Sequence, residues 1–181
     1  MSRIAIPSLD HAPAASKATL DAVHRQLGSV PNLFRLIGLS PAALTAYTGF
    51  NGALTKALDA KTRERIALAV AQVNGCDYCL SAHTYLGLNL AKLGPDEVAL
   101  NRRGTSSDPK AHAAVHFAAK VARERGHVGD ADLASVRAAG FSDAQIVEIV
   151  ALVAENSFTN YLNEVAKTDI DFPEIRASQA A

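Results

Sequence analysis

Apolar residues recur at every third or fourth position along most of this chain, and no segment shows the strict alternation that is typical of a strand. Gly, Pro, Ser and Asp residues separate the periodic segments, where helices commonly begin or end. The pattern predicts about eight or nine helices, over residues 14–27, 33–39, 41–58, 60–73, 76–93, 96–103, 109–125, 129–139 and 143–166. We therefore expect an all-α fold, a multi-helix bundle.

The length of 181 residues is enough for one domain with a substantial core, and short for two. No linker long enough to separate two domains is present. We expect a single domain over residues 1–181. Its ends are predicted to be an extended arm over residues 1–13, which contain Pro7 and Pro13, and a tail over residues 168–181, extended around Pro173.

The apolar spacing of residues 64–83 recurs in residues 145–164, which is consistent with an internal duplication of a helical hairpin. The alignment places Gln145 under Glu64, Ser157 under Cys76, Asn160 under Cys79 and Glu164 under His83. The second copy would keep the apolar spacing but would lack the candidate reactive residues at the matching positions. A second explanation stays open, because any two buried helices share such spacing.

Eighteen basic residues balance eighteen acidic ones, so the chain has no basic surface of the kind that supplies most of the energy of nucleic-acid binding. The first residues contain no apolar run that resembles a signal peptide. No segment reaches the ~18 apolar residues of a membrane helix. We expect a cytoplasmic protein that binds neither nucleic acid nor a membrane.

Candidate chemistry lies in residues 63–87, which contain both cysteines of the chain. Cys76 and Cys79 form a C-x-x-C pair, and His83 follows four positions later. In a reducing compartment this pair indicates redox or metal chemistry. If a helix begins near Cys76, all three side chains lie on one face. Cys76 is then at the helix N-terminus, where unpaired N–H groups favour a thiolate.

Glu64 precedes Cys76 by twelve residues, with Asn74 and Gly75 forming a predicted break between them. If the chain folds back at this break, Glu64 lies ~15 Å before it and His83 ~12 Å after it along the two helices. Glu64 then comes level with His83. The hypothesis is a relay in which Glu64 orients the imidazole of His83, and His83 takes the proton of the Cys79 thiol.

Two other interpretations of the cysteine pair are less favoured. A structural disulfide would close so small a ring that it contributes roughly 2 kcal/mol, against about 4.7 kcal/mol for a long loop. Zinc could use two thiolates, an imidazole and a carboxylate. Structural zinc sites, however, usually draw pairs of ligands from separated segments. Elsewhere, Asn156, Asn160, Tyr161 and Asn163 are polar for a helix interior, and they either line a pocket or interface or lie on a solvated face.

The spacing E-x11-C-x2-C-x3-H resembles the signature of the alkyl hydroperoxidase D-like (AhpD-like) proteins of the carboxymuconolactone decarboxylase superfamily. The resemblance begins near residues 30–44, VPNLFRLIGLSPAAL. It resumes at residues 158–173, FTNYLNEVAKTDIDFP, which resemble the C-terminal segment of the branch called peroxidase-related. It implies an AhpD-like all-α fold, a homo-oligomer (a trimer or a hexamer) and thiol peroxidase or disulfide reductase chemistry.

The resemblance also implies the roles of the motif residues. Cys79 would attack the peroxide, and Cys76 would resolve the product to a redox-active disulfide. This order agrees with the helix-end argument if His83 and Glu64 activate Cys79 while Cys76, expected nearer the surface, receives the reductant. Glu64 and His83 would belong to the proton relay. Well-studied members of the family carry a histidine just before the second cysteine, where this chain has Tyr78, an ordinary phenol and a poor base at neutral pH.

The resulting expectation is an antioxidant alkyl hydroperoxide reductase-like enzyme that uses Cys79, Cys76, His83 and Glu64. It would need no bound cofactor or metal. Its partners would be a hydroperoxide and an external dithiol reductant of thioredoxin-like or lipoyl type. Lactone decarboxylation is disfavoured, because decarboxylase members of the superfamily lack the cysteine pair. Two alternatives are a redox-regulated, chaperone-like interaction protein and a small-molecule acid–base enzyme that uses only His83 and Glu64.

Overall fold

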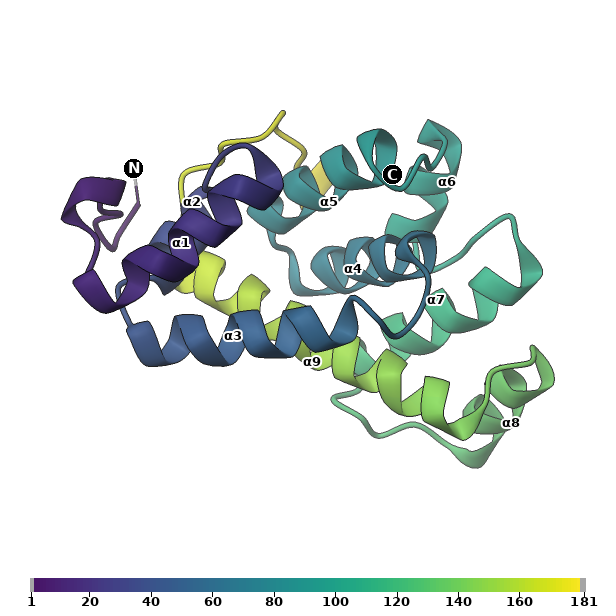
Figure 1. The fold of residues 1–181 in the computed structure, drawn as a ribbon. Helices are drawn as coiled ribbons and strands as arrows, with labels where there is room; N and C mark the ends of the chain where they lie inside the picture. The colour runs from purple at the N-terminus through teal and green to yellow at the C-terminus, as the bar shows by residue number, and fades with distance from the viewer. Residues whose placement is uncertain (1, 180–181) are drawn as a thin grey trace.

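The computed structural model describes residues 2–179, and over these residues the chain forms nine α-helices, two short 3-10 helices and no strand (Figure 1). The all-α prediction is therefore confirmed. The α-helices are α1 (Ala14–Leu27), α2 (Asn32–Ile37), α3 (Pro41–Leu54), α4 (Ala60–Asn74), α5 (Asp77–Asn89), α6 (Pro95–Arg102), α7 (Pro109–Arg123), α8 (Asp130–Ala138) and α9 (Asp143–Ala166). None of the helices in the described part of the chain has the length and hydropathy needed to cross a bilayer.

Helix α4 is the element around which the others pack, and it contacts α5, α6, α7 and α9. Its consecutive residues 66–71 are all buried, so every side of the middle of the helix faces protein. A helix that is apolar all round belongs inside a bundle. Asp59 begins the helix by accepting a hydrogen bond from the backbone N–H of Thr62 at 3.1 Å.

The predicted break between α4 and α5 is present. Gly75 ends α4 in the left-handed conformation (φ 68°), which glycine adopts without a steric penalty. Cys76 follows as the N-cap of α5, and its Sγ accepts the backbone N–H of Cys79 at 3.3 Å. The two helices therefore form a hairpin. α5 ends at Asn89, short of the predicted residue 93, because the chain turns back and the N–H of Leu93 donates to the carbonyl of Gly87.

Helix α9 does not repeat that hairpin. Ser142 and Gln145 form its capping box, and the helix then runs unbroken for 24 residues. Glu155 and Asn156 occupy the positions that correspond to Asn74 and Gly75, and without a glycine at this point the helix continues. The similarity between the two segments is thus one of apolar spacing, and the second segment is not a helical hairpin.

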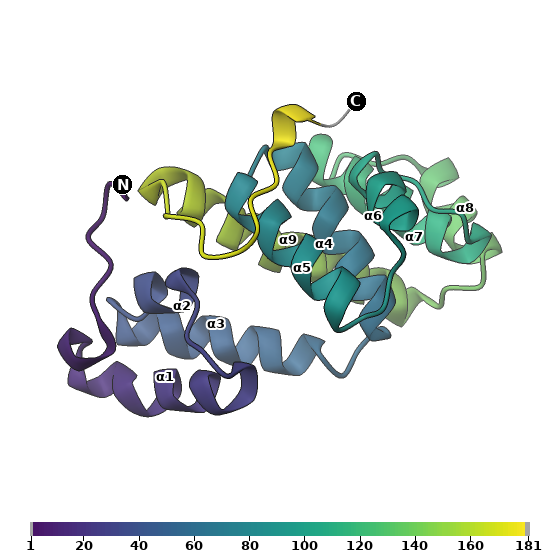
Figure 2. The ribbon, with the colours of Figure 1, turned by 90° about the horizontal axis from the view of Figure 1, so that it is seen from above.

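The last segment of the chain crosses over α5, as Figure 2 shows in yellow, and we call residues 168–179 the C-terminal strap. Asp171 accepts the N–H of Asn32 at 2.7 Å, and Ser81 Oγ accepts the N–H of Ile175 at 2.9 Å. Asp77, in the first turn of α5, accepts the N–H of Ala177 at 2.7 Å. The strap is therefore fastened to the helix that carries the cysteines.

The other end of the chain is less extended than predicted, because the proposed arm contains a 3-10 helix over Leu9–His11. The backbone N–H of Arg3 donates to the carbonyl of Ala166 at 2.6 Å, so the arm lies next to the end of α9. Residue 1 of the predicted arm and residues 180–181 of the predicted tail lie outside the described residues.

Glu97 on α6 fastens the loop that connects α6 to α7. Its carboxylate accepts hydrogen bonds from Ser106, from Ser107 and from Asn101 (2.9 Å), and it pairs with Arg65 at 3.0 Å. Burial alone would raise the pKa of the Glu97 carboxyl, but the hydrogen bonds from Ser106, Ser107 and Asn101 outweigh burial and lower it to about 2.

We expect Glu97→Gln to lower the free energy of unfolding by about 2–3 kcal/mol at neutral pH, because the charged acceptor is lost. A carboxyl with a depressed pKa contributes stability above its ordinary pKa of 4.5, and this contribution disappears as the pH falls through about 2. Urea unfolding at several pH values measures both effects. The wild type should lose stability more steeply than the variant over that range, with Glu124→Gln, at an exposed site, as the control. Equal pH dependence in wild type and Glu97→Gln would contradict the prediction.

Candidate active site

Two helices bring the predicted site residues together. Cys76 caps α5, Cys79 lies in its first turn, His83 lies one turn further on, and Glu64 comes from α4. His83 Nδ1 and Glu64 Oε2 are 2.9 Å apart, so the contact that a folded-back hairpin requires is present. The side chains of His83 and Glu64 remain 22% and 21% exposed. His83 and Glu64 are therefore the solvent-accessible part of the four-residue site.

Both thiols are free and buried, with Cys76 0% and Cys79 2% exposed. The expectation that Cys76 lies nearer the surface is therefore wrong. Cys76 packs into an apolar cluster that includes Leu20 of α1 and Leu33 of α2, and Phe172 of the C-terminal strap packs against the same cluster. These elements come from distant parts of the chain, so the sequence around Cys76 does not show that they bury it.

The surroundings of the two sulfurs favour a thiolate on Cys79. Burial would raise the pKa of the Cys79 thiol, but the hydrogen bond from Cys76, the charge of His83 and the amides of Asn163 and Asn160 lower it below the ordinary value. The pKa of Cys76 is raised, first by its hydrogen bond to Cys79 and then by burial. Helix-end electrostatics alone predicts the opposite order, and side chains from α5 and α9 reverse it.

His83 is arranged to carry a proton beside this thiolate. Burial would lower the pKa of the imidazole, but the charge and hydrogen bond of Glu64, followed by the charges of Cys79 and Glu155, raise it. An imidazolium next to a carboxylate and a thiolate can give its proton to a leaving oxygen and take it back from a thiol. The arrangement therefore suits thiolate chemistry with a proton donor.

Helix α9 supplies residues that the sequence motif did not include. Nδ2 of Asn163 donates to Cys79 Sγ at 3.3 Å, and Asn160 also lies in the group. Glu155, one turn earlier, is buried and accepts a hydrogen bond from Asn51 of α3 at 2.6 Å. Burial raises the pKa of the Glu155 carboxyl.

A signal for these residues exists in the sequence, because Asn156, Asn160 and Asn163 recur at helical spacing among apolar residues. The explanation of a solvated face is wrong for these three asparagines, since all of them are buried. Tyr161, grouped with them, is 59% exposed. No comparable sequence signal distinguishes Glu155, because single glutamates on helices are usually solvated.

Tyr78, which stands where well-studied relatives of the cysteine motif have a base, has a structural role. Its hydroxyl donates to Asp171 Oδ1 at 2.8 Å and accepts the N–H of Leu33 at 3.1 Å. Its ring packs edge-on against Phe172. Burial, and then the charge of Asp171, raise the pKa of the Tyr78 phenol, so Tyr78 does not act as a base at neutral pH. Tyr78 joins α5 to α2 and to the C-terminal strap.

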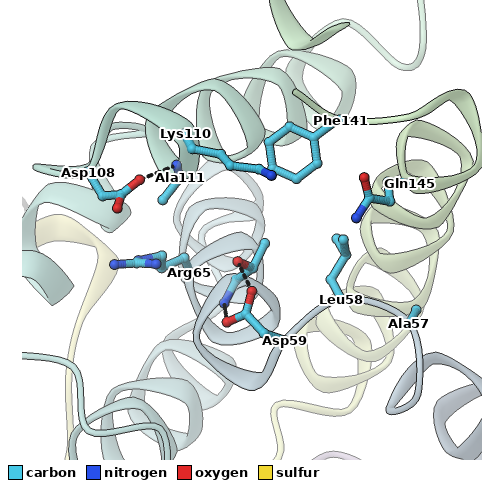
Figure 3. Close-up of a pocket in the computed structure, with 10 residues that line it drawn as sticks. Ala57, Leu58, Asp59, Arg65, Asp108, Lys110, Ala111, Phe141 and Gln145 are labelled. Carbon is cyan, nitrogen blue, oxygen red and sulfur yellow. Dashed lines mark hydrogen bonds between the residues drawn. The ribbon is translucent and has the colours of Figure 1, made fainter. Parts of the chain in front are cut away.

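No group of three or more His, Cys, Asp or Glu residues within residues 2–179 is arranged to hold a metal ion. A hollow of about 400 Å³ lies at the N-termini of α4 and α7 (Figure 3). Its acids, Asp59 and Asp108, already cap these two helices, and the ammonium of Lys110 lies over the ring of Phe141. The thiols lie past the far end of α4, ~21 Å along the helix. The hollow is therefore separate from the candidate site.

Comparisons with known proteins give the same fold. Residues 41–124 match the model of the carboxymuconolactone decarboxylase family. A solved structure of the AhpD core of an uncharacterized peroxidase-related protein from Ralstonia eutropha JMP134 is similar, with 25% identity, a TM-score of 0.83, and 94% of this chain and 92% of that chain covered. Another peroxidase-related protein, from Silicibacter sp. TM1040, has 25% identity, a TM-score of 0.80 and coverages of 93% and 91%.

A shorter similarity concerns sequence alone. Over 45 residues the chain is 51% identical to an uncharacterized protein from Haemophilus influenzae, and this match covers 24% of the chain. The chain thus spans only 40% of the length of that curated relative.

Proposed function

We propose that this protein, which belongs to the carboxymuconolactone decarboxylase superfamily as an AhpD-like member, is a thiol-dependent hydroperoxide reductase that serves in antioxidant defence. One observation carries the proposal: the Cys79 sulfur accepts a hydrogen bond from Asn163 and lies within the electrostatic influence of His83, which is paired with Glu64. Cys76, at the cap of the same helix, is the second thiol.

In the first step, the Cys79 thiolate attacks one oxygen of the O–O bond of a hydroperoxide. A sulfur–oxygen bond forms, the O–O bond breaks, and the sulfur loses two electrons to the departing alkoxide. The alkoxide takes the proton of His83 and leaves as an alcohol. The attacked oxygen is the terminal one and keeps its own hydrogen, so Cys79 becomes a sulfenic acid directly. Glu64 keeps the charged imidazolium oriented, through the contact at 2.9 Å.

In the second step, the sulfur of Cys76 attacks the sulfur of Cys79. A disulfide forms, and the sulfenic oxygen leaves as water with the proton of the Cys76 thiol. An external dithiol of thioredoxin-like or lipoyl type then reduces the disulfide by exchange and becomes a disulfide itself. Because both sulfurs are buried, this exchange requires side chains of the C-terminal strap or of its neighbours to move.

The surface of α9 supports a further part of the proposal, that the protein works as a homo-oligomer. The outer face of this helix exposes five large apolar side chains, which are Val147, Val150, Phe158, Tyr161 and Val165. Exposed apolar residues that follow one face of a helix commonly mark a protein interface.

The proposed function predicts a specific covalent product. One equivalent of an organic hydroperoxide should convert the two thiols into an intramolecular disulfide, which intact-mass analysis detects as the loss of two hydrogen atoms. A dithiol should restore the original mass. Protein whose thiols have first been alkylated serves as the control and should not change. Two unreacted thiols after peroxide treatment, or a protein that retains the mass of a zinc ion, would contradict the proposal.

A further inference from the structure

The buried face of α9 presents two asparagine amides to Cys79. Asn160 and Asn163 lie three residues apart, so they occupy one face of the helix, and both are buried. Nδ2 of Asn163 donates to Cys79 Sγ at 3.3 Å. A donor at this distance favours the negatively charged form of the sulfur over the neutral one.

Asn160 has a donor that its surroundings leave unused. Its Oδ1 accepts a hydrogen bond from Asn74 at 2.9 Å, which fixes the orientation of the amide and turns Nδ2 the other way. Within residues 2–179, this Nδ2 makes no hydrogen bond, although the amide lies close enough to Cys79 to lower the pKa of its thiol. A buried donor without a partner costs about 1–3 kcal/mol in general, so its presence next to a reactive sulfur needs an explanation.

We propose that the two amides form a donor site at Cys79, in which Asn163 holds the sulfur as a thiolate and Asn160 binds the oxygen atom that this sulfur receives from a hydroperoxide. The inference deepens the proposed function and rests on it. The terminal oxygen that moves to sulfur keeps its hydrogen and its lone pairs, so it can accept the free N–H of Asn160 while negative charge builds up on the departing oxygen. A fixed donor that holds the reacting oxygen in line with the sulfur accelerates the reaction by positioning it.

Titratable groups around Cys79 stay in place in all the proposed variants. Those that interact with Cys79 itself are Cys76, His83, Tyr47 and Tyr78. Glu64 and Glu155 act on His83, and Asp171 accepts the hydroxyl of Tyr78. Asn163 acts on the reaction through the sulfur, so it is a positioning residue. Asn160 would touch the reacting oxygen.

Asn156 provides a matched control, because it is the same residue type on the same buried side of α9. Its Nδ2 donates to the carbonyl of Leu152, at 2.8 Å within its own helix. Asn156→Ala therefore reports the general cost of removing a buried asparagine, without removing a donor from Cys79.

The first measurement is the rate of iodoacetamide alkylation against pH, with no peroxide present. Asn163→Ala should move the midpoint of the thiol titration up by about one pH unit, because a hydrogen bond to a charged group is lost. Asn163→Asp is isosteric and should move it further, since a carboxylate repels the thiolate; it also serves if the alanine variant does not fold. Asn156→Ala should keep the wild-type midpoint.

The second measurement is single-turnover oxidation by an organic hydroperoxide. Asn160→Ala should slow the oxidation of Cys79 by about 10- to 100-fold, with a smaller change in the alkylation midpoint than Asn163→Ala causes. One outcome refutes the donor site and leaves the proposed function standing. In it, the wild type reduces hydroperoxide, the Asn163 variants have the wild-type alkylation midpoint, and Asn160→Ala has the wild-type oxidation rate. Equal effects in Asn156→Ala also refute the donor site. If the wild type does not react with hydroperoxide, the proposed function fails, and the alkylation profile still decides the role of Asn163.

Discussion

Cys79→Ser should abolish hydroperoxide turnover, with a loss of at least about 10³-fold, because a serine hydroxyl stays protonated where the thiol ionises. The environment that lowers the pKa of Cys79 cannot rescue an alcohol, whose ordinary pKa lies far above that of a thiol. Consumption of an organic hydroperoxide, coupled to oxidation of a dithiol, measures the loss.

Cys76→Ser should give a different result from Cys79→Ser. Cys79 can still be oxidised once, but no second thiol resolves the sulfenic acid, so the variant should consume one equivalent of peroxide and then stop. A sulfenic acid probe, detected by mass spectrometry, should label Cys79 in Cys76→Ser. The converse pattern, with label on Cys76 and turnover lost only in Cys76→Ser, would show that Cys76 attacks first.

The same pair of variants separates the alternative functions. An acid–base enzyme that uses only His83 and Glu64 would retain its activity in Cys79→Ser. A chaperone-like protein that uses the cysteine pair as a sensor would form the disulfide with peroxide, but it would not turn over repeatedly with a dithiol.

His83→Ala should slow the reaction of Cys79 with hydroperoxide by about 10²- to 10³-fold at neutral pH, because the alkoxide loses its proton donor and the thiolate loses a positive neighbour. The charge of His83 contributes to the lowered pKa of Cys79, so its removal should raise that pKa and move the rate profile to higher pH. Above the pKa of His83 the imidazole of the wild type is also uncharged, so the difference in rate between the wild type and His83→Ala should shrink.

Glu64→Gln tests the relay from its other end. The Glu64 carboxylate is the main group that raises the pKa of His83, so the variant should lower this pKa and leave less imidazolium at neutral pH. A rate loss of about 10-fold is expected, smaller than for His83→Ala, because the imidazole remains. His112→Ala, at an exposed histidine on α7 that contacts Thr105, is the matched control. If Cys79→Ser is inactive but His83→Ala reacts at the wild-type rate, the relay is wrong and the role of the thiol stands.

Local signals predicted much of this fold. Apolar periodicity placed every helix, and capping residues such as Asp59 and Ser142 marked helix starts correctly. Glycine at position 75 indicated the break that makes α4 and α5 a hairpin. From that break and the helical rise, the contact between Glu64 and His83 followed. These features depend on neighbouring residues in the chain, so the sequence determines them.

Long-range contacts decided the remaining properties of the candidate site. Asn163 reaches Cys79 from 84 positions further along the chain, and Asp171 reaches Tyr78 from 93 positions away. The pKa of a thiol depends on burial and on every donor around the sulfur, whatever segment supplies them. The sequence by itself therefore determined the helices, the motif and the hairpin that joins Glu64 to His83. Only the tertiary structure decided which sulfur is favoured as the thiolate, what Tyr78 holds in place, and that both thiols lie beneath other parts of the chain.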